Sequence, residues 1–175
     1  MHHGIFLDRD GVINEVLSDR VKFVNNPSDF HLLPGVGEAV HLFNTMGYPV
    51  FVVTNQGGIG LGYMKERALD AVHNQMKDDL AAFGAYIDDI AYCPHKPHAG
   101  CACRKPRPKM ILDLAKKHDI ALQGSFMVGD REPDIMAGKE AGTTTVLIGE
   151  RNQHKIGADK HFPNLLAFAR WLKNQ

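Results

Sequence analysis

Two aspartates one residue apart follow a short apolar run near the start of the chain. Asp8 and Asp10 come directly after Ile5-Phe6-Leu7, and Gly11 follows them. Such a run is typical of a buried strand, and open α/β sheets bind their ligands at the carboxyl ends of strands. Two carboxylates this close are costly unless a cation or a shared proton relieves their repulsion. A strand followed by an aspartate-rich turn has the same pattern, so other segments must decide between the two.

Three later segments add hydroxyl, amide, cationic and acidic side chains. They are Val52-Val53-Thr54-Asn55-Gln56, Cys103-Arg104-Lys105-Pro106 and Met127-Val128-Gly129-Asp130-Arg131-Glu132-Pro133-Asp134. Alone, a Thr-Asn pair after a strand is as commonly a helix cap, and an Arg-Lys-Pro segment is usually a solvated basic turn. Their succession behind the first aspartate pair favours one joint site over these separate local roles.

A cluster of cysteines precedes the basic pair. Cys93, His95, Cys101 and Cys103 place three thiols and one imidazole within eleven positions. An odd number of closely spaced cysteines makes a poor disulfide framework and a better metal site. Four such ligands suit a tetrahedral Zn²⁺ that has no open position, so this zinc is expected to be structural and to order the loop. The alternatives are free cysteines in a loop, or His98 as a substitute ligand, which we expect to be exposed.

Composition narrows the class of protein. The chain has 175 residues, 44% of them hydrophobic and 23% charged, and its formal net charge is zero. These values are typical of an ordinary globular protein and do not favour a nucleic-acid partner. The sequence shows neither a long apolar run nor a signal-peptide pattern, so we expect no membrane partner. We therefore predict a single cytoplasmic domain over residues 1–175 that acts as a monomer.

Apolar patterning indicates alternating strands and helices. Strands are predicted at residues 5–7, 50–53, 126–128 and 144–148, and helices near 36–43, 65–83, 109–118, 135–141 and 165–172. For the second helix the expected apolar face comprises Ala68, Ala71, Val72, Gln75, Met76 and Leu80. Alternation of this kind indicates a parallel sheet that is covered on both faces. Residues 17–33 and the loop 92–108 are left to shape the entrance to the site.

Taken in order, these motifs resemble those of the haloacid dehalogenase-like (HAD) phosphatases. More narrowly, residues 8–14, 54–62, 103–108 and 129–134 are similar to the patterns DRDGxIN, TNQxGxxxG, CRKPxP and GDxxxD. Those patterns belong to the branch of D-glycero-D-manno-heptose 1,7-bisphosphate phosphatases and histidinol-phosphatases. The resemblance spans roughly residues 4–150. It implies an α/β fold with a Rossmann-like HAD core, a parallel sheet flanked by helices, a minimal cap and a zinc-knuckle loop.

The resemblance also implies Mg²⁺-dependent hydrolysis of a phosphate monoester. Asp8 would attack phosphorus and form an aspartyl-phosphate, while Asp10 would act first as general acid and then as general base. Mg²⁺ would be held by Asp8, the main-chain carbonyl of Asp10 and Asp130. Asp134 would position Asp130 or a metal-bound water, although capping of a helix explains it equally well.

Other residues are expected to bind the substrate. Thr54 would donate to a phosphoryl oxygen and Lys105 would neutralise the charge that develops on the transferred group. Gly11, Asn55 and Gln56 are expected to line the same phosphate cradle through their amides. Arg104 and Arg131 are expected to contact phosphate or another anionic group of the substrate.

Two positions depart from the heptose branch. Gly57 stands where serine is common and Leu61 where arginine is common, which questions the recognition of a second phosphate. The predicted substrate is a small anionic phosphate ester. Heptose 1,7-bisphosphate comes first, with the cleaved phosphate left open, followed by histidinol phosphate or another small sugar phosphate. A receiver module phosphorylated on aspartate and a catalytically silent zinc-stabilised domain are disfavoured, because Asp10 and every other catalytic position are filled.

Overall fold

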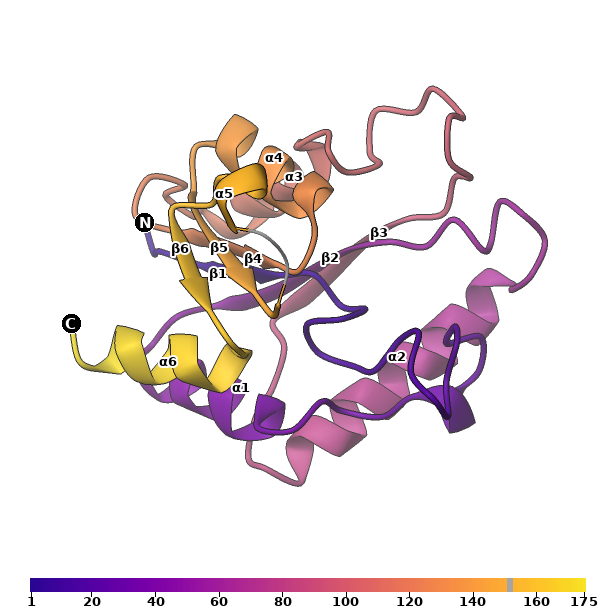
Figure 1. The fold of residues 1–175 in the computed structure, drawn as a ribbon, viewed down its shortest axis with the longest axis horizontal. Helices are drawn as coiled ribbons and strands as arrows, with labels where there is room; N and C mark the ends of the chain where they lie inside the picture. Colours follow the sequence, from indigo (N-terminus) through magenta and orange to yellow (C-terminus); the bar gives the residue numbers. More distant parts are fainter. Residues whose placement is uncertain (151–152) are drawn as a thin grey trace.

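In the computed structural model, which describes residues 1–150 and 153–175, six parallel strands form a sheet. The strands are β1 (Ile5–Leu7), β2 (Val50–Asn55), β3 (Asp89–Cys93), β4 (Phe126–Gly129), β5 (Thr144–Ile148) and β6 (Lys160–Phe162). Their spatial order is β3-β2-β1-β4-β5-β6, as Figure 1 shows. The chain winds outward from β1 to β3, then returns through β4 and winds outward in the other direction. The order is that of a doubly wound sheet, and it confirms the predicted α/β fold with a parallel, Rossmann-like sheet.

Helices cover both faces of the sheet. On one face lie α1 (Val36–Thr45), α2 (Glu66–Ala81) and α6 (Leu165–Lys173), and on the other α3 (Lys109–His118), α4 (Glu132–Ala141) and the short α5 (Gln153–Ile156), as seen in Figure 1. Alternate strand residues feed the two layers: Ile5 and Leu7 pack in the core with α1, α2 and α6, whereas Phe6 packs with α3 and α4. Because β1 is buried on both faces, its sequence is continuously apolar.

The four predicted strands and five predicted helices are confirmed, with small differences at their ends. Strands β3 and β6 and helix α5 were not predicted from the sequence. Both missed strands form edges of the sheet, and most of their residues are only half-buried. Strand β6 has no apolar run, and the short run Ile90-Ala91-Tyr92-Cys93 of β3 leads directly into the cysteine cluster.

The predicted apolar face of α2 is confirmed at Val72, Met76 and Leu80. It was wrong elsewhere, because Leu69 and His73 are buried while Ala68, Ala71 and Gln75 are only half-buried.

The sheet brings three of the sequence motifs to one edge. Leu7 of β1 pairs with Val52 of β2 on one side and with Val128 of β4 on the other, so the residues that follow emerge together. The winding reverses between β1 and β4, and that switch point is where open α/β sheets bind ligands.

Two long connections supply loops at this edge. One joins β1 to α1 and contains a single 3₁₀ turn at Pro27–Asp29, and the other joins β3 to α3. They contain the segment 17–33 and all of the segment 92–108 except Tyr92 and Cys93, which end β3; both segments were expected to shape the entrance. Within the described residues, none of the helices combines the length and apolar character needed to cross a bilayer.

Close packing of α4 on the sheet yields a stability prediction. A Cβ atom at Gly138 would lie 2.7 Å from the Cβ of Met127 and 2.8 Å from the Cγ2 of Thr145. The Cβ of Met127 is fixed by the backbone, and the side chain of Thr145 is held by hydrogen bonds between its hydroxyl and Asp159, so Gly138→Ala should push α4 off the sheet. Overpacking costs about 1–3 kcal/mol, against about 1 kcal/mol gained in helix propensity. Urea unfolding should therefore show net destabilisation, whereas exposed Glu140→Ala should change the unfolding free energy little.

Candidate active site

Residues from four separate segments meet at the carboxyl edge of the sheet. Asp8 follows β1 directly, Thr54 lies at the end of β2, and Asp130 follows β4. Lys105 comes from the loop between β3 and α3 and reaches into the same place. The backbone of Asp8 is held by its N–H, which donates to the carbonyl of Val128 on the neighbouring strand at 3.0 Å.

Lys105 is the central cation of the site. Its side chain is 3% exposed, and its Nζ lies 2.7 Å from Oδ1 of Asp8, 2.7 Å from Oδ1 of Asp134 and 2.9 Å from the carbonyl oxygen of Val53. Burial tends to lower the pKa of Lys105, but the carboxylates of Asp134 and Asp8 outweigh it and raise that pKa. The ammonium group is therefore permanently charged and oriented by three acceptors.

Three carboxylates cluster here, and two of them, Asp8 and Asp134, contact the ammonium group. Oxygens of Asp8, Asp130 and Asp134 lie within 4.8 Å of one another. Burial, together with the Asp134 charge, raises the pKa of Asp8 well above its ordinary value, although Lys105 opposes the shift. Such an excess of hard oxygen donors and negative charge fits a divalent cation of the Mg²⁺ type. Oδ1 of Asp134 accepts from Lys105, a contact that was not expected, and its Oδ2 accepts from the N–H of Arg131 at the start of α4, which is the helix-capping role.

Gly11 makes room for this acidic cluster. Its φ is +85°, and a Cβ atom there would lie 2.2 Å from Oδ2 of Asp130. The backbone N–H of Gly11 was expected to point into the phosphate cradle. That prediction is wrong, because this N–H donates to the carbonyl of Asn14 at 2.9 Å within the turn. Glycine is thus needed because Asp130 approaches the backbone closely.

The side chain of Asp10 lies outside the acidic cluster and has donors of its own. Oδ1 accepts from Nη2 of Arg9 at 2.7 Å and from Nδ2 of Asn14 at 3.0 Å, and Oδ2 accepts from Nε2 of Gln56 at 3.2 Å. Burial tends to raise the pKa of Asp10, but the Arg9 guanidinium and the three hydrogen bonds lower it. Two carboxylates two positions apart thus have opposite electrostatic environments.

Sequence reasoning missed three residues behind Asp10. Arg9 and Asn14 stand inside the first motif, and their complete burial could not be read from its pattern. His73 of α2 is buried as well and lies 3.2 Å from Nη1 of Arg9. A histidine at a core position of an amphipathic helix was the only sequence signal for it.

Neighbouring residues of the motif after β2, Thr54 and Asn55, have different partners. Thr54 is 1% exposed, and its hydroxyl accepts from Nε2 of Gln56 at 2.9 Å, which leaves the O–H able to donate. Asn55 was expected in the phosphate cradle, but its amide pairs with the backbone of Lys105. Its Nδ2 donates to the Lys105 carbonyl at 3.1 Å, and its Oδ1 accepts from the Lys105 N–H at 2.9 Å. Asn55 therefore positions the lysine.

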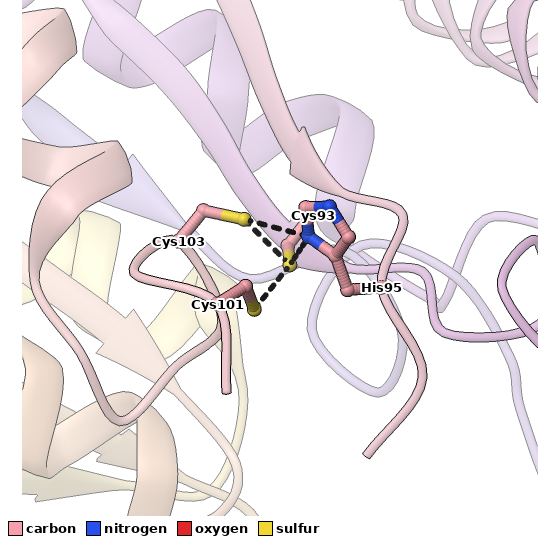
Figure 2. Close-up of side chains that lie close together, drawn as sticks. All are labelled: Cys93, His95, Cys101 and Cys103. Carbon is pink, nitrogen blue, oxygen red and sulfur yellow. Dashed lines mark hydrogen bonds between the residues drawn. The ribbon is translucent and has the colours of Figure 1, made fainter. Parts of the chain in front are cut away.

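Figure 2 shows the four predicted zinc ligands gathered in one place. Nδ1 of His95 lies 3.3 Å from Sγ of Cys93 and 3.2 Å from Sγ of Cys103, and the sulfur of Cys93 lies 3.6 Å from that of Cys101. The sulfurs of Cys93 and Cys103 are closer, at 2.8 Å. Ligands around a tetrahedral zinc lie about 3.3–3.8 Å apart, given bonds of about 2.0–2.3 Å. The donor set fits zinc, and exposed His98 lies outside it.

The remaining basic residues lie at the rim. Nη1 of Arg104 donates a long hydrogen bond of 3.4 Å to the carbonyl of His95, and a Cβ atom at Gly57 would lie 3.1 Å from that nitrogen. Arg131 is exposed at the start of α4, and Leu61 is 51% exposed. Gly57 thus lets the Arg104 guanidinium lie against the loop after β2.

Comparison with known proteins agrees with this geometry. The HAD-hydrolase-like family matches residues 102–167. A D-glycero-β-D-manno-heptose-1,7-bisphosphate 7-phosphatase of Bordetella bronchiseptica is 38% identical over 91% of this chain and 87% of its own length. One of Photorhabdus laumondii, named for the α-anomer, is 37% identical over 78% of this chain and 76% of its own length.

A solved structure matches almost the whole chain. The D,D-heptose 1,7-bisphosphate phosphatase of B. bronchiseptica, complexed with magnesium and phosphate, has a TM-score of 0.90 and 36% identity, and covers 98% of both chains. With the described site, this similarity establishes that the chain is a phosphatase and belongs to the heptose-1,7-bisphosphate 7-phosphatase family of the HAD superfamily.

Proposed function

We propose that this protein removes one phosphate, the 7-phosphate, from D-glycero-D-manno-heptose 1,7-bisphosphate by way of a phosphorylated Asp8. The observation that carries the proposal is the contact of Lys105 with Asp8, made at the edge of the sheet where Thr54 and Asp130 also emerge. Relatives at 36–41% identity bear the name of this reaction.

The first step transfers the phosphoryl group. The Asp8 carboxylate attacks phosphorus, the P–O bond to C7 breaks, and the leaving alkoxide takes a proton from Asp10. Lys105 and the Thr54 hydroxyl stabilise charge on the equatorial oxygens. Arg9 keeps the pKa of Asp10 low in the free protein, but the phosphate dianion beside it is a like charge, which favours the protonated acid.

The second step returns Asp8 to its starting state. Asp10, now a carboxylate, takes a proton from water, and that water attacks the aspartyl-phosphate to release inorganic phosphate. Mg²⁺, held by Asp8, Asp130 and the main-chain carbonyl of Asp10, would supply positive charge that offsets the carboxylates and the phosphate. The three buried donors to Asp10 hold its carboxyl group in place for both proton transfers.

We also assign Zn²⁺ to the cluster of Cys93, His95, Cys101 and Cys103 in Figure 2, with a structural task. Four protein ligands leave zinc no coordination position for water. The loop that they order leads directly into Arg104 and Lys105, so the metal acts on the reaction by placing these cations.

The nucleophile is tested by Asp8→Asn. The amide keeps the shape of the side chain but cannot attack phosphorus, so kcat should fall by roughly 10³-fold or more, about 4 kcal/mol in barrier height. Far-ultraviolet circular dichroism should confirm the fold. Exposed Asp70→Asn is the matched control and should keep full turnover. Turnover of the Asp8 variant within tenfold of the parent would contradict the covalent mechanism.

Zinc is tested by elemental analysis of protein purified without chelator, which should contain about one zinc per chain. Cys101→Ser should lower both zinc content and the thermal midpoint, and activity should fall with them, because loop order depends on the metal. Ser18→Ala, outside the cluster, serves as the purification control. Metal-free protein with normal activity would show that the cysteines have another role.

Substrate choice is tested by comparing kcat/KM for both anomers of heptose 1,7-bisphosphate, for heptose 7-phosphate and for histidinol phosphate. The bisphosphate should rank first, because Arg104 at the rim can hold the second phosphate by a charge-assisted pair. Arg104→Ala should raise KM for the bisphosphate by about tenfold and leave KM for the monophosphate nearly unchanged. A higher rank for histidinol phosphate would transfer the assignment to that substrate, with Leu61 as the first residue to examine.

A further inference from the structure

Arg9 is the largest fully buried side chain among the described residues, although it carries a permanent charge. Each of the three guanidinium nitrogens has a different hydrogen-bond partner. Nε donates to Oδ1 of Asn14 at 3.1 Å, Nη2 donates to Oδ1 of Asp10 at 2.7 Å, and Nη1 lies 3.2 Å from Nε2 of His73. A buried cation of this kind is stable only while its donors are satisfied.

The contact with His73 has a defined direction. Arginine has donors only, so Nε2 of His73 must be the acceptor and the ring is neutral with its proton on Nδ1. Burial first, and then the Arg9 charge, lower the pKa of His73 to about 3, which agrees with a neutral ring at every physiological pH. His73 therefore acts as a fixed acceptor and takes no part in proton exchange.

The histidine is itself held from two sides. It belongs to the buried face of α2, one helical turn from Leu69 and Met76, which are also buried. Its ring also lies 6.4 Å, between centroids, from Tyr92 of β3, which directly precedes the Cys93 ligand. Since α2 and β3 are rigid elements, they fix the ring, and the ring in turn limits where Arg9 can turn.

We propose that His73 is a positioning residue that acts through Arg9 to hold the carboxyl group of Asp10 in the orientation for proton transfer. The inference rests on the proposed role of Asp10 as acid and base. Without the acceptor at position 73, Nη1 would lose its partner in a buried place, and the guanidinium would turn to find another. Nη2 would then move from Asp10, which would keep only its bonds to Asn14 and Gln56.

Removal of the acceptor should lower kcat selectively for substrates with a poor leaving group. An alkoxide leaving group needs the proton of Asp10, whereas 4-nitrophenolate leaves without much help. His73→Leu should therefore lower kcat for heptose 1,7-bisphosphate by about tenfold or more, a share of the roughly 10²–10⁴ that a positioned acid contributes. For 4-nitrophenyl phosphate kcat should change less than about threefold, and KM should stay nearly constant for both substrates.

Conservative variants separate positioning from folding. The side-chain oxygen of His73→Gln can take the place of Nε2 and should restore most of the loss, whereas His73→Asn is too short to reach Arg9 and should behave like His73→Leu. If His73→Leu does not fold, His73→Asn keeps a polar group at the site and provides the same measurement. Val72→Ala, next along the same helix, should lower the thermal midpoint without changing the ratio of the two activities.

Asp10→Asn, measured beside these variants, identifies which idea fails. If Asp10→Asn loses the alkyl phosphate selectively but His73→Leu and His73→Asn lose both activities equally, the positioning role of His73 is wrong and the acid role of Asp10 stands. If Asp10→Asn shows no selectivity for leaving group, the acid role is wrong and the inference falls with it. Selective loss in all three variants, with rescue by His73→Gln, supports both.

Discussion

The buried ammonium of Lys105, held between the carboxylates of Asp8 and Asp134, is the interaction on which the rest of this site depends. It joins the end of β1, the first turn of α4 and the loop before α3. A buried charge without partners is far more costly than a paired one, so the loop can close only if both carboxylates are in place. Asn55 completes the arrangement by pairing with the lysine backbone from β2. The same contact positions the cation beside the carboxylate of Asp8, which we propose as the nucleophile.

Two aspartates of one short motif obtain different properties from different neighbours. Asp8 lies among carboxylates in a buried place, which raises its pKa and makes a divalent cation a natural partner. Asp10 lies against the guanidinium of Arg9, which lowers the pKa of its carboxyl group in the free protein. We expect the charge of an anionic substrate to raise that pKa again. Separate environments for two nearby carboxylates are a general way to assign a nucleophile and an acid within one fold. Here the separation arises because the side chain of Asp10 points away from the carboxylates of Asp8, Asp130 and Asp134.

The cysteine loop and the glycine-rich loop after β2 are built against each other. The N–H of Gly60 donates to the carbonyl of Pro94 at 2.8 Å, and Gly57 leaves room for the Arg104 guanidinium. Ordering of the cysteine loop by a metal would therefore also place the second loop. The entrance is therefore shaped mainly by loops that support each other. Arg104, a cation at the rim, is held by contacts with a loop other than its own.

Local pattern alone determined the buried strands, the amphipathic helices and the donor sets, because periodicity, ligand chemistry and the spacing of Asp8 and Asp10 are properties of short segments. It could not reveal the edge strands, because β6 has no apolar run and the short apolar run of β3 leads directly into the cysteine cluster. It also misplaced Asn55 and the amide of Gly11, since their partners are chosen by the packed chain. His73 shows the limit most clearly. It lies 64 positions from Arg9, and only tertiary structure brings this acceptor to the guanidinium, because burial requires each donor to find a partner wherever the fold supplies one.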